Sequence, residues 1–175
     1  GVAVSALFNA GISGTLVFFS DRVHGALTFM NGSLSARSWG EVQMILPYTI
    51  VGLLLALLFS RQMNILILGD DVARGLGLNV ELTRMGFTAL AALLAASAVS
   101  AVGLLGFVGL IVPHSIRLLM GNDYKVLFPG SALLGAALVM LSDTFARTIF
   151  SPVEIPVGIV MAVLGVPFFL YLLRR

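Results

Sequence analysis

The side chains able to do chemistry gather in one segment, Arg61–Arg84, which interrupts a very apolar sequence. Asp70 and Asp71 stand at the start of a short helical pattern, and acids in a first turn suit the positive end of a helix. Gly77 can end that helix, because glycine adopts a left-handed C-terminal conformation without strain. The pattern predicts a short charged helix, Asp70–Gly77, that another protein can grip. A solvated loop that satisfies its own backbone is the alternative.

A second pair of charges, Asp143 and Arg147, lies within the apolar run Pro129–Ile149. The two residues are four apart with the acid first, which is the favourable order on a helix. In a medium of low dielectric constant the pair costs less than either charge alone. Two interpretations stay open: an internal ion pair near the outer mouth of the protein, or an arginine that docks a partner protein.

His114 follows Pro113 in the apolar piece Phe107–Met120. A metal site would need cysteine or acidic neighbours at ligand spacing, and this histidine has none. We therefore expect a hydrogen-bonded structural histidine, with Arg117 on the same helix face. Pro113 removes one helix hydrogen bond and favours a bend.

The chain holds no set of residues that indicates catalysis. It has neither a His-Glu-x-x-His motif nor a converging nucleophile and base, and it lacks the G-x-x-x-x-G-K-[ST] phosphate loop. We therefore expect a protein that is not an enzyme, with no cofactor and no bound metal.

Composition places the chain in a lipid bilayer. Of its 175 residues 59% are hydrophobic and only 10% are charged, whereas a soluble domain carries roughly 25% charged residues. The net charge of +2 is too small for a nucleic-acid partner, and the absence of cysteine excludes disulfides. The chain opens within an apolar run without a charged region before it. We expect one transmembrane domain over residues 1–175, as an internal fragment of a longer membrane protein.

The apolar runs predict an all-α transmembrane bundle. A spanning helix needs ~20 apolar residues, and five segments come near this length: Val2–Ser20, Met44–Ser60, Met85–Leu105, Pro129–Ile149 and Val157–Leu173. Phe107–Met120 is too short to span alone, so we expect a broken or half helix covered by the rest of the bundle. Gly25–Ser35 is a candidate for a short interfacial helix. On the first run, Asn9, Ser13 and Thr15 could line a pathway or hydrogen-bond between helices.

Basic residues predict the orientation. With the C-terminus in the cytoplasm, six alternating passes place most of them on that side: Arg61, Arg74, Arg84, Arg117, Lys125, Arg174 and Arg175. The other side keeps Arg22, Arg37 and Arg147. This distribution obeys the positive-inside rule only if the short piece Phe107–Met120 crosses, or nearly crosses, the protein.

Several stretches resemble the signature of a known transporter family. The stretches are R-Q-M-N at Arg61–Asn64, L-G-D-D-V-A-R-G-L-G at Leu68–Gly77, the glycine-rich and proline-containing Gly106–Tyr124, S-D-T-F-A-R at Ser142–Arg147, and the tail Glu154–Leu173. In order and spacing they are similar to the permeases of iron-siderophore, haem and cobalamin ABC importers, the FecCD family.

The resemblance implies a permease of ten transmembrane helices, of which this chain would hold the fifth to the tenth. Such permeases pair with a second permease subunit in the bacterial cytoplasmic (inner) membrane. Two cytoplasmic ABC ATPase subunits drive them, and a periplasmic or lipoprotein substrate-binding protein delivers the cargo. Siderophore, haem and cobalamin stay open as cargo.

The resemblance also implies roles for particular residues. Residues 64–80 would couple to the ATPase through Ala73-x-x-x-Gly77, with Asp70, Asp71 and Arg74 around it, although Asp71-Val72-Ala73 replaces the Glu-Ala-Ala of the fuller importer motif. Arg147 matches the arginine that docks the binding protein. The family's fifth helix lines part of the pathway, which favours the polar residues of the first run.

An ion-coupled secondary transporter is the alternative function. Such a transporter needs an unpaired acid within the membrane to bind Na⁺ or H⁺. Asp143 is the sole candidate, and Arg147 stands beside it in the sequence.

Overall fold

The computed structural model describes residues 2–18, 23–35, 37–149 and 155–174. These residues form helices without any strand, as the apolar runs predicted. In chain order the helices are α1 (Val2–Phe18), α2 (Val23–Asn31), α3 (Trp39–Leu58), α4 (Ser60–Leu66), α5 (Asp70–Gly75), α6 (Val80–Val102), α7 (Val108–Met120), α8 (Tyr124–Thr148) and α9 (Val157–Leu173). The all-α class is therefore confirmed.

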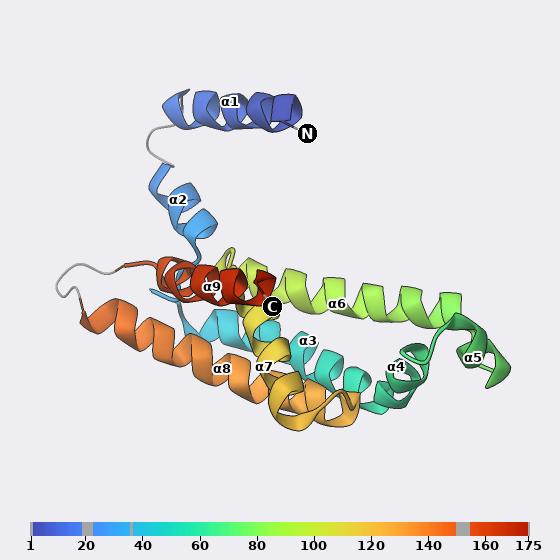
Figure 1. Cartoon of the computed structure of the whole chain (residues 1–175). Coiled ribbons are helices and arrows are strands. Elements are labelled where there is room, and N and C mark those ends of the chain that lie inside the picture. The colour runs from blue at the N-terminus through green and yellow to red at the C-terminus, as the bar shows by residue number, and fades with distance from the viewer. Residues whose placement is uncertain (1, 19–22, 36, 150–154, 175) are drawn as a thin grey trace.

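Three helices, α3, α6 and α8, form the long part of the bundle (Figure 1). They have 20, 23 and 25 residues and are apolar enough to cross a membrane. At 1.5 Å per residue they are about 30–38 Å long. Helix α3 packs on α6 and α8, and the shorter apolar helices α7 and α9 pack on α8 and on each other. The expected spans at Val2–Ser20 and Val157–Leu173 correspond to helices of 17 residues, and Ser20 lies outside the described residues.

Most large apolar side chains of the bundle point outward. Met85, Leu133 and Met140 are each more than two-thirds exposed. Few apolar residues are buried, and most of them belong to α7, α8 and α9, among them Val112, Ala146 and Met161. An apolar surface of this extent suits lipid or other membrane helices as its surroundings.

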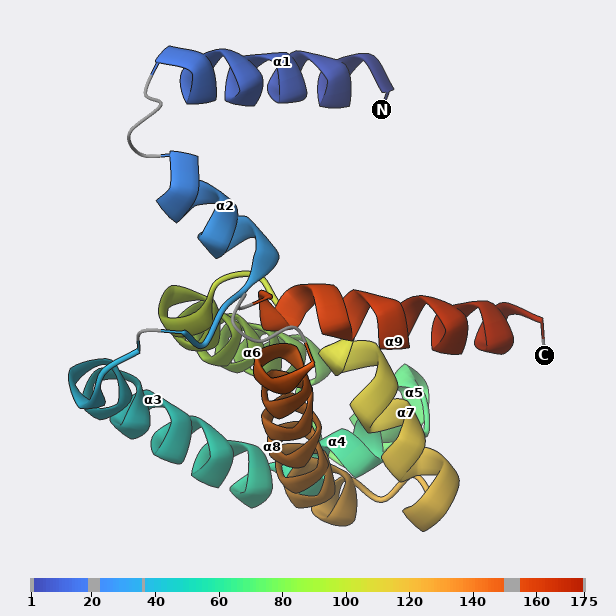
Figure 2. The same cartoon turned by 90° about the vertical axis from the view of Figure 1, so that its left-hand side faces the viewer.

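Helix α1 does not join the bundle. Figure 2 shows it apart from the other helices, connected by α2. Leu7 and Phe8 are 73% and 67% exposed, so the described part of the chain does not cover its apolar surface. The expected interfacial helix at Gly25–Ser35 corresponds to α2, which ends where Gly32 adopts a positive φ of 65°.

Several helices begin earlier than the apolar runs predicted, because polar caps set their first residues. The Glu41 carboxylate accepts the Ser38 backbone N–H at 2.8 Å, which starts α3 at Trp39. The Asn79 side chain accepts the Leu82 N–H at 3.1 Å and starts α6. Each cap satisfies a backbone donor that the first turn of a helix leaves free.

One end of the bundle is closed by backbone contacts between three distant segments. Leu104 N–H donates to Phe29 O at 3.0 Å, and Ser33 N–H donates to Val102 O at 2.9 Å. Gly158 N–H donates to Gly32 O at 3.3 Å. We call this the glycine junction, formed by Gly32, Gly103 and Gly158. A Cβ added at Gly158 would collide with the Asn31 carbonyl oxygen, and one at Gly103 with the Phe29 carbonyl oxygen.

Gly158→Ala is expected to destabilise the protein, because the obstacle to the new methyl group is backbone that cannot rotate away. Overpacking of this kind costs about 1–3 kcal/mol, which corresponds to a fall of several degrees in melting temperature. Thermal unfolding in detergent would measure it. Gly86→Ala in α6 is the matched control, since its Cβ would meet nothing within 4 Å. Equal melting temperatures for the two variants would contradict the expectation.

The two basic segments, Arg61–Arg84 and Arg117–Lys125, lie at the same end of the bundle, as the count of basic residues required. Asn64, in the first segment, contacts Asp123 in the second. The chain returns to that end through α7, whose 13 residues extend about 20 Å. Pro113 lies inside this helix, and Phe107 before it has a φ of 64°. The short piece is thus a helix that crosses much of the bundle, with the covering helices α8 and α9 beside it.

Candidate functional site

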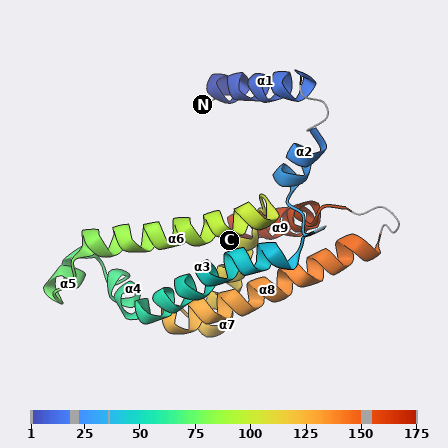
Figure 3. The same ribbon diagram turned by 180° about the vertical axis from the view of Figure 1, so that it is seen from behind.

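The charged segment includes two short helices, α4 and α5. Figure 3 shows α5 projecting beyond the end of α6, with α4 between α3 and α5. Asp70 and Asp71 occupy the first turn of α5, as expected. Arg84 of α6 donates through Nη2 to the Asp70 carboxylate at 2.7 Å. Because the two side chains are 61% and 40% exposed, this pair contributes little stability and mainly orients α5.

Gly77 ends the α5 segment, as the sequence predicted. Its φ is 81°. Gly77 N–H donates to Arg74 O at 2.9 Å, and Leu78 N–H donates to Ala73 O at 3.0 Å. These two hydrogen bonds form the C-terminal arrangement that needs a left-handed residue, for which glycine is best suited.

Ala73 is fully buried, so its side chain cannot itself form part of a docking surface. The exposed apolar residues of this helix are its neighbours Val72 and Leu76, at 50% and 62%. They are four residues apart and share one helix face. The Ala73-x-x-x-Gly77 pattern therefore holds α5 in place, while Asp71, Val72 and Leu76 form its outer surface.

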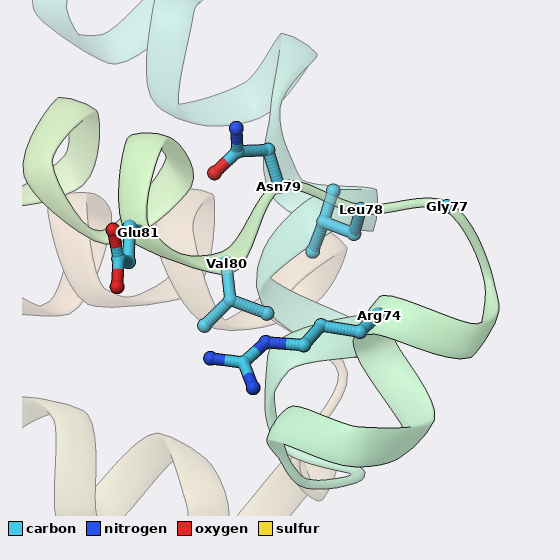
Figure 4. A pocket seen from close by; sticks show the side chains of 6 residues that line it. All are labelled: Arg74, Gly77, Leu78, Asn79, Val80 and Glu81. Atoms are coloured by element: carbon cyan, nitrogen blue, oxygen red, sulfur yellow. The ribbon is translucent and has the colours of Figure 1, made fainter.

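A pocket of about 420 Å³ lies between the end of α5 and the start of α6. Figure 4 shows the Arg74 side chain extending beneath Val80 toward the first turn of α6. The other lining residues are Gly77, Leu78, Asn79 and Glu81. With one basic and one acidic side chain at its rim, the pocket offers polar contacts to a protein side chain rather than a deep ligand cavity.

Asn64 joins the charged segment to the start of α8, a contact that the sequence did not reveal. Its Nδ2 donates to Asp123 Oδ1 at 2.7 Å, and its Oδ1 accepts the Tyr124 N–H at 3.0 Å. Asp123 also accepts the Lys125 N–H at 2.9 Å and so caps α8. The hydrogen bonds from the Lys125 backbone and the Asn64 amide hold the pKa of the Asp123 carboxyl below its usual range. Two features of the sequence could have indicated this contact: the R-Q-M-N match, which contains Asn64, and the position of Asp123 just before a helix start.

Asp143 and Arg147 form the ion pair that their spacing predicted. Arg147 Nε donates to Asp143 Oδ2 at 2.8 Å, near the end of α8 opposite Asn64. The arginine side chain is 43% exposed and the aspartate 23%. Asp143 accepts the Nε–H of this half-exposed side chain. The Nη groups are the donors with which a guanidinium can bind a second carboxylate.

His114 and Arg117 make different contacts from one face of α7. The His114 ring meets Phe168 of α9 edge to face, with centroids 5.9 Å apart. Arg117 Nη2 donates to the Tyr124 hydroxyl at 3.4 Å. His114 thus packs between α7 and α9, while the exposed Arg117 contacts the first residue of α8. Among the residues the structure describes, no three His, Cys, Asp or Glu side chains come together to hold a metal ion.

The polar residues of α1 are not gathered into a lined pathway. Asn9, Ser13 and Thr15 are exposed, and the Thr15 hydroxyl donates to its own helix at Gly11 O, 2.8 Å away. Since α1 stands apart from the bundle, their role in a pathway stays a prediction.

The described residues thus form a bundle of apolar helices, with one ion pair at Asp70–Arg84 and another at Asp143–Arg147 near the opposite end. The FecCD transport family matches residues 1–175, and the chain belongs to this family.

Its relatives are import permeases. The chain is 43% identical to the cobalamin import system permease protein BtuC of Halobacterium salinarum, over 99% of this chain and 47% of that protein. It is 41% identical to the Fe(3+)-citrate import system permease protein YfmE of Bacillus subtilis, covering 99% and 52%. It is also 41% identical to the hemin transport system permease protein HmuU of Yersinia pestis, covering 100% and 53%.

A solved structure described as an inward-facing conformation of a putative metal-chelate type ABC transporter has the same fold. The TM-score is 0.87 at 30% identity, over 99% of this chain and 57% of the other. The chain thus spans about half the length of the curated relatives it matches.

Proposed function

We propose that this chain is a membrane-spanning part of an ABC-importer permease in the cytoplasmic membrane. It passes a metal-chelate type cargo, an iron-siderophore, haem or cobalamin, and leaves ATP hydrolysis to separate subunits. The names of relatives mention cobalamin, hemin and siderophore transport, and the solved structure is described as a metal-chelate type ABC transporter. The family match extends over the whole chain. The chain itself supplies no catalytic step.

The observation that carries the proposal is the position of α5. A permease that is driven by a cytoplasmic motor needs a rigid element that projects from the bundle and offers a surface to grip. Helix α5 has a buried anchor in Ala73 and an outer face of Val72 and Leu76. Its Schellman-type end fixes its orientation. The ATPase would bind this face together with the pocket beside Arg74.

Two further partners follow from the proposal. The exposed apolar surface of α1 and of the long helices is matched to a second permease subunit and to lipid. At the opposite end, Arg147 would bind an acidic side chain of the extracellular substrate-binding protein.

Co-purification and uptake test the proposal together. The complete transporter containing this chain, purified from its native membrane, is expected to retain an ABC ATPase. Reconstituted into vesicles with its substrate-binding protein on the opposite side, it should take up cargo when ATP is supplied on the ATPase side and no ion gradient is present. Uptake that needs an ion gradient and ignores ATP would support the secondary transporter instead.

A further inference from the structure

Asn64 is the point where the charged segment is fastened to the rest of the bundle. One short side chain makes two hydrogen bonds to residues some 60 positions later in the chain, to Asp123 Oδ1 and from Tyr124 N. Two bonds to one amide fix both the position and the orientation of α4 relative to α8. Since α4 has only seven residues, a helix of this length depends on such contacts for its position.

The two elements that Asn64 joins lead to the two proposed partner surfaces. In one direction α4 continues through three residues into α5, with Val72 and Leu76. In the other direction α8 continues for 25 residues, about 38 Å, to the Asp143–Arg147 pair. Arg117 of α7 reaches the same place through the Tyr124 hydroxyl. The start of α8 is therefore where α4, α7 and α8 meet.

We propose that Asn64 is a positioning residue that transmits the displacement of α4 and α5 to α8, so that ATPase movement reaches the opposite end of the permease. The inference rests on the proposed function. A transmitted displacement requires a link that does not yield, and a short hydrogen bond to a charged carboxylate is stronger than one between neutral groups. Physical coupling between two such residues is measured by a double-mutant cycle.

The chemistry of the pair allows a swap test. Asn64→Asp places two carboxylates where an amide met a carboxylate at 2.7 Å, and their repulsion should open the contact. Asp123→Asn alone keeps an acceptor for the Asn64 amide and a cap for Lys125. The double variant Asn64→Asp/Asp123→Asn restores the interaction with donor and acceptor exchanged. In it the new amide, on α8, donates to the new carboxylate, on α4, and that carboxylate still accepts the Tyr124 N–H.

The readout is cargo taken up per ATP hydrolysed by the reconstituted transporter. We expect Asn64→Asp to lower this ratio at least about fivefold, in the range of ordinary coupling energies, while the ATPase stays bound. Asp123→Asn keeps the acceptor but removes its charge, so it should lower the ratio less than Asn64→Asp does. The double variant should return to within about twofold of the parent value. Asn122→Asp is the matched control, because Asn122 is exposed and lies one position before the cap.

The inference fails if Asn64→Asp has the parent ratio, or if the double variant is as thermally stable as the parent but still uncoupled. Should Asn64→Asp alone unfold, the double variant decides, because its stability and its ratio are measured separately. Failure of the proposed function looks different: the unsubstituted transporter would then show no ATP-driven uptake at all.

Discussion

Leu76→Glu is expected to abolish ATP-driven uptake while leaving the chain folded. Leu76 is 62% exposed and shares its face of α5 with Val72, so the bundle does not need its side chain. A partner that covers it gains about 1.5–3 kcal/mol from its burial. Glutamate removes that gain and adds a charge to be desolvated, which together lower affinity by well over tenfold. Co-purified ATPase and stimulated ATP hydrolysis would both fall.

Two other variants separate loss of the ATPase contact from a general effect of the substitution. Leu82→Glu is the matched control: Leu82 is 65% exposed in the first turn of α6, where an acid is well tolerated, so its uptake should stay close to that of the parent. Ala73→Leu should act differently, because Ala73 is buried and a larger side chain would displace α5 and lower the melting temperature. Normal uptake by Leu76→Glu would show that α5 is not the ATPase contact.

Arg147→Glu is expected to slow the association of the substrate-binding protein about tenfold at low salt, and to flatten its salt dependence. The Nε–H is held by Asp143, which presents the rest of a half-exposed guanidinium to a partner carboxylate. Charges at the rim of an interface act mainly through the association rate and its dependence on salt. Association kinetics at two salt concentrations would measure the change. An acid-to-base substitution on the binding protein should restore part of the rate.

Arg37→Glu is the control for this charge reversal. Arg37 also forms an i,i+4 pair with an acid, Glu41, at 3.1 Å, and it precedes α3 at the same end of the bundle. Equal slowing by both variants would mean that net charge, not a site at Arg147, steers the partner. If Arg147→Glu associates at the parent rate at low salt, Arg147 is only the internal partner of Asp143.

Apolar run length predicted which segments are helices but not where they begin. The runs start at Met44, Met85 and Pro129, whereas α3, α6 and α8 begin five residues earlier in each case, at Trp39, Val80 and Tyr124. Hydrophobicity measures contact with lipid, while the first turn of a helix is decided by the polar side chain that caps it. The capping side chains are those of Glu41, Asn79 and Asp123. Cap positions predict helix starts better here than hydrophobicity does.

In the candidate sites, contacts along one helix could be predicted from the sequence, whereas contacts between distant segments could not. Local relations were predictable, because the Asp143–Arg147 pair and the glycine end of α5 follow from residue spacing along one helix. The Asn64–Asp123 contact joins residues 59 positions apart, and no periodicity within one segment encodes such a pair. The burial of Ala73 was likewise unpredictable, because it depends on where α5 folds back toward α6.

The glycine junction can be completed only late in the synthesis of this protein. The Gly32 carbonyl is made before α3, α6 and α8, but the amide that it accepts belongs to Gly158, at the start of α9. A carbonyl without a partner is costly in lipid. We therefore expect Gly32 of the nascent chain to stay in contact with water or with the insertion machinery until α9 has been inserted. Helix α9 is translated after all three long helices, but its Gly158 N–H pairs with the Gly32 carbonyl, which is translated before any of them.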